Sequence, residues 1–187
     1  MRWLHIYLSM VSFGALLFFA VTGFTLNHAD WLFGSRPTTT QRPGRVELAW
    51  VKAPDAAVAK LEIVEQLRRA HAIKGALADF RLEDAQCVVS FKGPGYSADA
   101  FINRETGAYE LTESRLGFVA VINDLHKGRD TGRAWSLLID ASAGLMTLVS
   151  LTGLTLIFFL KRRRRTGLVA AAAGALLCYL VYLWLVP

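Results

Sequence analysis

Three long runs without a charged residue limit what this chain can fold into. Trp3–Leu26, Ala141–Leu160 and Leu168–Pro187 contain no Asp, Glu, Lys or Arg. A helix of about 20 apolar residues is long enough to span a bilayer. We therefore predict transmembrane helices at residues 1–27, 134–160 and 167–187, with a soluble insert between the first two. The mean hydropathy of +0.35 agrees, because it is too high for an ordinary soluble domain and too low for a chain wholly within the membrane.

The first run has an alternative interpretation as a secretory signal peptide. Its apolar stretch is longer than the usual signal core of about 7–15 residues. No clear small-x-small cleavage site separates it from the polar segment that follows. We therefore favour an uncleaved helix.

Basic residues predict the orientation of the helices. Lys161–Arg165 reads KRRRR between the second and third runs, and Arg2 precedes the first. Short loops rich in Lys and Arg stay in the cytoplasm. The N-terminus and the loop at residues 161–166 are then cytoplasmic, and the insert lies outside. The net charge of +6 is largely this loop, so we assign it to the surface of the lipid bilayer and expect no nucleic-acid partner.

The insert is predicted to be a small α+β unit. Residues 28–52 are expected to be a linker, because the stretch 34–49 is rich in Gly, Pro, Thr and Arg. Residues 53–112 begin with helical periodicity that reaches Gly75, with Asp55 as a plausible cap. Four β-rich stretches separated by turns follow, at residues 78–82, 87–91, 98–103 and 108–111. We predict one helix and an antiparallel meander.

Residues 113–133 combine an amphipathic helix with the motif LHKGRDTGR at Leu125–Arg133. Apolar residues of the stretch 116–125 fall on one broad helical face that ends at His126. We predict a short helix lying at the outer membrane surface, with its apolar side dipping inward.

Two histidines from separate segments are expected at that surface. His28 follows the first apolar run, and His126 precedes the second. A bis-histidine haem needs two neutral imidazoles on opposite sides of the iron, and its propionates need cationic partners. Such partners follow His126 as Lys127, Arg129 and Arg133. We therefore predict an outer haem held by His28 and His126. Interfacial histidines that only anchor a helix or make hydrogen bonds are the alternative.

His5 is the candidate for a second, inner haem. It lies twenty-three residues before His28, which corresponds to roughly 35 Å of helix, close to a full bilayer. The chain offers no second histidine on the inner side, so this site needs a partner copy or does not exist. We expect His71, in the helix of the insert, to be a surface residue. The chain has no CxxC, HExxH, GxGxxG or GxSxG motif, which gives hydrolase and dehydrogenase functions no support.

Several segments resemble a known family. The order of TGFTLNHADW, KGPG, FINRETG and NDLHKGRDTGRAWSLLIDASAGL is similar to that of the PepSY-associated transmembrane proteins of bacterial inner membranes. The resemblance covers most of the chain and implies that the insert is a periplasmic PepSY unit. Larger relatives include inner-membrane reductases that use b-type haems held by membrane histidines to reduce ferric siderophores. By position, the resemblance implicates His28, His126 and His5.

The chain is shorter than those reductases and has fewer membrane helices and histidines. A homodimer, a one-haem protein and a relative without the chemistry all stay open. We expect a multi-pass inner-membrane protein that holds haem b and passes electrons from an unknown donor to a periplasmic ferric chelate, as a ferric (siderophore) reductase does. The alternative is a non-catalytic, membrane-anchored binding or assembly module for an iron-uptake system.

Overall fold

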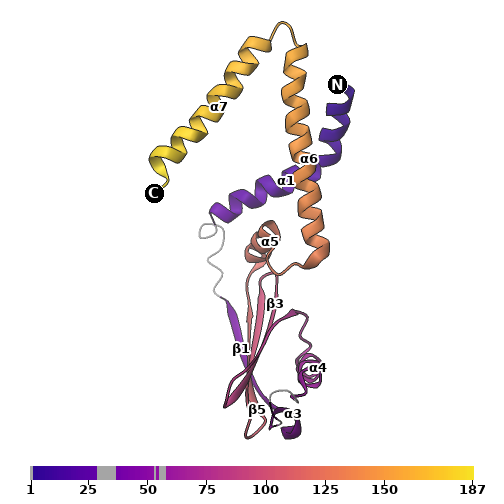
Figure 1. Ribbon diagram of the computed structural model, residues 1–187, viewed down its shortest axis with the longest axis vertical. Helices are drawn as coiled ribbons and strands as arrows, with labels where there is room; N and C mark the ends of the chain where they lie inside the picture. The colour runs from indigo at the N-terminus through magenta and orange to yellow at the C-terminus, as the bar shows by residue number, and fades with distance from the viewer. Residues whose placement is uncertain (1, 29–36, 53, 55–57) are drawn as a thin grey trace. The chain divides into compact units, whose positions relative to one another are not determined.

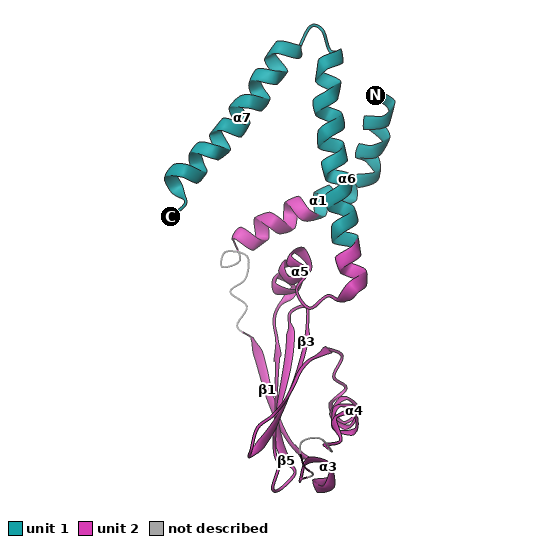
Figure 2. Ribbon diagram, in the orientation of Figure 1, with its two compact units in different colours: residues 1–18, 138–187 teal, residues 19–137 magenta. Residues whose placement is uncertain are grey.

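The computed structural model describes residues 2–28, 37–52, 54 and 58–187 (Figure 1). The chain divides into two compact units (Figure 2). Unit 1 comprises residues 1–18 and 138–187, and unit 2 comprises residues 19–137. Ala29, Asp30 and the expected cap Asp55 lie outside the described residues.

Among the described residues, three helices are long and apolar enough to cross a membrane. They are α1 (Arg2–Asn27), α6 (Gly132–Phe159) and α7 (Arg164–Leu185). Most of their large apolar side chains are exposed, as expected for helices whose solvent is lipid. These three helices coincide with the predicted apolar runs and fit a membrane protein. The predicted basic loop is shorter than expected, because α7 already begins at Arg164.

The insert in unit 2 is built on a five-stranded antiparallel sheet. Its predicted meander is confirmed as β2 (Ala76–Leu82), β3 (Gln86–Gly93), β4 (Tyr96–Asn103) and β5 (Ala108–Arg115). The strand order is β1-β5-β4-β3-β2. Alternate side chains of β3, β4 and β5 point to one face, where the core lies. Phe91, Ile102 and Leu111 are fully buried there.

Helix α4 (Lys60–His71) covers this face with Ile63, Val64 and Leu67 (Figure 1). The buried positions lie three and four residues apart, which places them on one stripe of the helix. The helix begins later and ends earlier than the periodicity predicted. It ends because Ala72 adopts a left-handed conformation (φ 52°), and its N–H caps the carbonyl of Arg68.

The predicted linker at residues 28–52 is wrong for two segments. Thr38–Arg45 form strand β1, which pairs with β5, and Leu48–Lys52 form the short helix α3. Strand β1 lies at the edge of the sheet and is almost wholly exposed. Its sequence, TTTQRPGR, therefore carries no hydrophobic alternation, and Pro43 is tolerated because an edge strand has one unpaired side.

The predicted amphipathic helix after the sheet is confirmed as α5 (Phe118–Lys127). It follows Gly117, which is extended, and ends at Gly128, which is left-handed with φ 68°. The Gly128 N–H donates to the carbonyls of Asp124 and Leu125, which closes the last turn. Helix α5 therefore presents His126 within one turn of its C-terminus.

Candidate functional site

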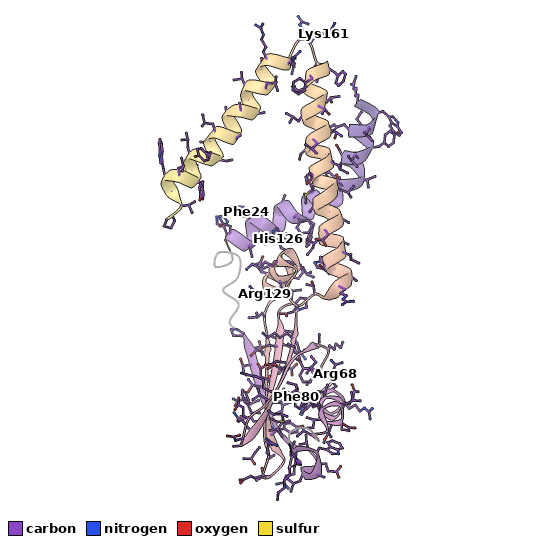
Figure 3. All side chains as sticks on the ribbon, viewed as in Figure 1. Phe24, Arg68, Phe80, His126, Arg129 and Lys161 are labelled. Atoms are coloured by element: carbon purple, nitrogen blue, oxygen red, sulfur yellow. The ribbon has the colours of Figure 1, made fainter. Side chains whose placement is uncertain are left out.

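His126 lies against the C-terminal part of α1, within unit 2 (Figure 3). Its Nδ1 is 2.6 Å from Thr22 Oγ1, and its ring meets Phe19 edge-on with centroids 5.3 Å apart. Gly23 leaves room for the ring, since an added Cβ would lie 3.4 Å from His126 Cε1. Among the described residues, no hydrogen-bond partner is found for His126 Nε2. We call His126, Thr22 and Gly23 the outer station.

A buried polar contact beside the outer station holds α5 on α1. The Thr25 hydroxyl donates to Asn123 Oδ1 at 3.0 Å, and both side chains are buried. Val119, Asn123 and His126 lie four and three residues apart, so they share one face of α5. Because a buried amide without a partner costs free energy, the Asn123–Thr25 pair favours one register of α5 on α1.

His28 lies on another side of α1. Its backbone N–H still reaches the Phe24 carbonyl, so the helical course continues to this residue. Nine residues separate it from Phe19, which turns its direction by about 180° around the helix. The ring stacks on Phe24, and its Nδ1 is 3.1 Å from the Phe24 carbonyl oxygen. Within one chain, the structure therefore does not bring His28 and His126 to a common point.

The three predicted propionate contacts are exposed and lie after His126. Lys127 and Arg133 are solvent-accessible, and Arg129 Nη1 lies 4.0 Å from Asp124 Oδ1 (Figure 3). With 62% of the Arg129 side chain exposed, this ion pair is weak. The cations are thus on the surface and available to an anionic group, but nothing within the described residues gathers them at one point.

The glycines of LHKGRDTGR allow left-handed backbone conformations. Gly128 and Gly132 have φ of 68° and 79°, and Asp130 between them has φ 56°. Left-handed conformations favour Gly and tolerate Asp, so the motif encodes the sharp connection from α5 to α6. Trp135 Nε1 donates to the Leu125 carbonyl at 2.8 Å and ties the start of α6 to the end of α5.

His5 forms a second contact of the same type, within unit 1. Its Nδ1 is 2.9 Å from Thr152 Oγ1. An added Cβ at Gly153 would lie 3.2 Å from His5 Cε1, so the ring sits over this glycine. Among the described residues, no hydrogen-bond partner is found for His5 Nε2. We call His5, Thr152 and Gly153 the inner station.

The hydrogen bonds of Thr152 determine which His5 nitrogen carries the proton. The Thr152 hydroxyl lies 2.8 Å from the Leu148 carbonyl oxygen and 3.0 Å from that of Val149. A carbonyl can only accept, so the single hydroxyl proton is directed to the helix backbone. The Thr152 oxygen then accepts a hydrogen bond from His5 Nδ1–H, which leaves Nε2 with its lone pair. Such a nitrogen can ligate a metal or accept a proton.

The KGPG turn joins the sheet to α5. The Gly95 N–H donates to Asp124 Oδ2 at 2.9 Å, and the Leu116 N–H donates to the Gly95 carbonyl at 2.8 Å. Gly95 has φ 63°, and an added Cβ would lie 2.6 Å from Val121 Cγ2. Only glycine fits both the conformation and the space. The turn thus links the sheet of the insert to α5, the helix that carries His126.

The FINRETG segment has a structural role. Asn103 Oδ1 accepts hydrogen bonds from the N–H groups of Glu105 and Thr106, both at 2.9 Å. Gly107 completes the turn at φ 69°, where an added Cβ would lie 2.7 Å from the Val46 carbonyl oxygen. This motif therefore builds the β4–β5 turn, and these contacts are structural.

His71, which we expected at the surface, is partly buried against the sheet. Its Nε2 lies 2.7 Å from the Tyr109 hydroxyl. Burial lowers the pKa of His71, the positive charge of Arg42 lowers it further, and Glu113 opposes the shift. Burial also raises the pKa of Tyr109. Both groups therefore stay neutral near pH 7, as suits a structural hydrogen bond.

Glu113 is the buried charge of the insert, with 4% of its side chain exposed. Arg115 donates to it from Nη2 at 2.6 Å and from Nε at 2.9 Å. Burial alone would raise the pKa of Glu113, but the hydrogen bonds of Arg115 and Tyr96 and the nearby charges lower it. Burial and Glu113 raise the pKa of Tyr96 to about 12. The cluster is self-satisfied and stabilises one end of the sheet.

Sequence reasoning missed Thr22, Thr152 and Asn123, the residues that contact the histidines or their helix. A hydroxyl in an apolar helix is an ordinary feature, so none of the three attracts attention alone. The useful signal is that Thr-Gly occurs in both helices that receive a histidine. No group of three or more His, Cys, Asp and Glu residues that could hold a metal ion is present in the described part of the chain.

A family model described as "Putative PepSY_TM-like" matches residues 1–187. The match covers the apolar helices, the insert and both histidine stations. Comparison with curated proteins and with solved structures gives no match.

Proposed function

This chain belongs to the putative PepSY_TM-like family, and we propose that it is a haem b protein of the bacterial inner membrane. It passes electrons from a donor on or within the membrane to a ferric chelate, such as a siderophore complex, in the periplasm. The geometry of the outer station carries the proposal, because one imidazole nitrogen of His126 is held by Thr22 and the other is available.

The donor chemistry of the outer station fits haem iron. Iron takes neutral imidazole nitrogens as axial ligands. Metal-binding histidines almost always engage their second ring nitrogen in a hydrogen bond, which fixes the tautomer and the ring orientation. His126 meets this requirement through Thr22, and His28 meets it through the carbonyl of Phe24. When bound, haem supplies a one-electron couple between ferric and ferrous iron.

A second histidine ligand for the iron would come from a second copy of the chain. The chain has four histidines, of which His71 lies in the insert on Tyr109. His28 and His126 of one copy face different sides of α1. In a homodimer, His28 of one copy and His126 of the other would hold the haem iron together. The exposed cations Lys127, Arg129 and Arg133 would be available to its propionates.

Orientation follows from the basic loop between α6 and α7. Arg164 and Arg165 continue the cationic run into the first turn of α7. The positive-inside rule keeps this run in the cytoplasm and puts the insert and the outer station in the periplasm. Haem held there by His126 would supply one electron to a ferric chelate in the same compartment.

An absorbance spectrum tests the proposal. The protein is expressed with ample haem, purified in detergent and, if colourless, reconstituted with haemin. We expect a Soret band from which His126→Ala removes the contribution of the outer haem and which His71→Ala retains, because His71 belongs to the insert. A wild-type protein that stays colourless after both treatments would show that the proposed function is wrong.

Complementation tests the dimer. Neither His28→Ala nor His126→Ala is expected to bind the outer haem alone. When the two variants are co-expressed with different tags and the mixed dimer is isolated, one interchain site is intact and about half of the haem should return. Ligation within one chain predicts no recovery in the mixed dimer.

A membrane-anchored binding module is the second candidate, and a groove on the insert favours it. The groove holds about 660 Å³ between α3 and α4. Trp50 and Leu61 give it an apolar wall, and Glu62, Glu65 and Arg69 give it charge. A colourless protein that binds a ferric chelate, with the binding weakened by Trp50→Ala, would favour this function over electron transfer.

A further inference from the structure

The two helices that receive a histidine carry the same short sequence. Thr22–Leu26 of α1 reads TGFTL, and Thr152–Leu156 of α6 reads TGLTL. The histidines that contact them also share their context, since each follows a leucine, as Leu4-His5 and Leu125-His126. The chain thus contains the order Leu-His, then Thr-Gly-x-Thr-Leu, twice. The second copy is longer because the α5–α6 connection lies within it.

The two copies contact each other crosswise. His5 of the first copy contacts Thr152 of the second at 2.9 Å, and His126 of the second contacts Thr22 of the first at 2.6 Å. In each station the imidazole Cε1 lies over the glycine that follows the threonine, 3.2 Å and 3.4 Å from where a Cβ would be. The same pair of atoms makes the same contact in both units.

The neighbouring threonines repeat as well. Thr25 Oγ1 lies 2.9 Å from the Thr22 carbonyl oxygen, and Thr155 Oγ1 lies 2.9 Å from that of Thr152. In both Thr-Gly-x-Thr-Leu segments the second threonine therefore places its hydroxyl oxygen at the same distance from the carbonyl oxygen three residues earlier, although the Thr25 proton is donated to Asn123. Sequence identity and local geometry therefore agree in both copies.

The helix directions agree too. In unit 2, α5 and α1 are antiparallel, since Asn123 contacts Thr25 and His126 contacts Thr22. In unit 1, Arg2 lines a hollow with Leu156 and Phe159, while His5, one turn later, contacts Thr152. The start of α1 therefore runs antiparallel to α6. Arg2 and Asn123 each precede the histidine of their station by three residues.

We propose that residues 4–26 and 125–156 are the two halves of an inverted repeat, and that Thr22 and Thr152 are positioning residues. Thr152 accepts Nδ1–H from His5, and Thr22, whose hydroxyl lies 3.5 Å from the Phe19 carbonyl oxygen, takes the same role toward His126. The Nε2 lone pair of each histidine is then turned toward a metal-centred ligand. The inner station is thereby a second ligand site of the same type as the outer one. The identification of the ligand as haem rests on the proposed function. The repeat and the tautomers of the two histidines do not depend on it.

The inverted arrangement has a physical reason. Two repeats of opposite topology are related by an approximate two-fold axis that lies in the membrane plane. His5 and Thr22 stand at opposite ends of α1, and each binds the other half. One sequence unit, used twice, therefore makes one histidine–threonine station in each of the two compact units. This explains why His5 has no histidine mate in its own chain: it is the counterpart of His126 and not its partner.

The tautomers are tested on the protein without haem. Protein labelled with ¹⁵N-histidine is placed in nanodiscs at a pH about two units above the ordinary histidine pKa of about 6.5, where imidazole is neutral. Signals are assigned with His5→Gln and His126→Gln. We expect both histidines to carry the proton on Nδ1. Thr152→Val should move the His5 proton toward Nε2 and leave His126 unchanged, and Thr22→Val should do the reverse.

Haem binding gives the second measurement. Loss of an outer-shell partner weakens metal binding by about 10–100-fold. We expect Thr22→Val to weaken haem retention at the outer station and to raise its midpoint potential, because an imidazole without its acceptor is a poorer donor to ferric iron. Thr22→Ser keeps the hydroxyl and should restore both. Thr147→Val on α6 is the matched control, since the Thr147 hydroxyl contacts only its own helix carbonyl.

The glycines supply a test that leaves the hydroxyls in place. Gly153→Ala introduces a methyl 3.2 Å from His5 Cε1 and should shift the His5 signals, whereas Gly144→Ala has nothing within 4 Å and should not.

The outcomes separate the two ideas. A protein that binds no haem but shows both Nδ1–H tautomers, each sensitive to its own threonine, refutes the proposed function and supports the repeat. Tautomers that ignore the threonine substitutions refute the positioning role, whether or not haem binds.

Discussion

Gly95→Ala tests whether the KGPG turn holds the insert against α5. Two costs follow from the structure. Alanine at φ 63° is strained by about 1–2 kcal/mol, and its Cβ would lie 2.6 Å from Val121 Cγ2 and 3.3 Å from the Val121 nitrogen. Overpacking of this kind costs about 1–3 kcal/mol. We expect local destabilisation of about 3 kcal/mol, which corresponds to a more than 100-fold larger opening constant for this contact.

Amide hydrogen exchange of the full chain in nanodiscs measures this effect. The peptide that covers α5 should lose protection in Gly95→Ala, because the Gly95 N–H bond to Asp124 is displaced together with the turn. The same loss should extend to the face that carries His126.

Gly93→Ala is the matched control within the same turn. An added Cβ at Gly93 meets nothing closer than 3.9 Å. This variant should therefore exchange like the wild type.

A double variant separates strain from overlap. Val121→Ala removes the nearest methyl, so Gly95→Ala with Val121→Ala should regain the overpacking part of the loss and keep the conformational part. Equal effects of Gly93→Ala and Gly95→Ala, or no recovery in the double variant, would refute the reasoning.

Three further predictions concern the other contacts of unit 2. Because the folded chain lowers the pKa of His71, the stability that this residue contributes is complete above the ordinary histidine pKa and declines as the pH falls. His71→Gln should therefore reduce the drop in thermal midpoint between pH 7.5 and pH 5.5, measured by scanning calorimetry in nanodiscs. Thr25→Val removes the buried bond to Asn123 and should destabilise the α5–α1 contact by about 1 kcal/mol, measured as faster exchange in α5. Arg115→Met removes the main partner of Glu113, so burial should then raise the pKa of that carboxyl; the loss of stability should be large at pH 7.5 and smaller near pH 4.5.

Matched controls accompany these variants. Arg81→Met breaks an ion pair at 3.0 Å whose carboxylate, on Asp79, is 51% exposed, whereas that of Glu113 is 4% exposed. Exposed pairs contribute little, so Arg81→Met should leave the melting unchanged at both pH values. Thr147→Val controls for Thr25→Val. A pH effect in Arg81→Met equal to that in Arg115→Met would contradict the role given to burial.

The prediction from sequence and the structure differ most clearly at the histidines. His28 and His126 were expected to form a pair because the predicted topology brings both to one surface. That inference used only the position along the membrane normal. The direction of a side chain around a helix is a second coordinate, and it changes by about 100° for each residue. His28 therefore lies on a different side of α1 from the side that His126 contacts.

By itself, the sequence determined the features that are encoded locally. The lengths of the apolar runs predicted the three long helices, the β-rich stretches predicted β2–β5, and the glycines predicted the turns. Each of these features depends on residues that are neighbours in the chain. Tertiary structure alone decided which partner each histidine has. Thr22 and His126 are 104 residues apart, and His5 and Thr152 are 147 residues apart. Such pairs form because a partly buried imidazole N–H needs an acceptor, and only the packing of the helices determines which hydroxyl supplies it.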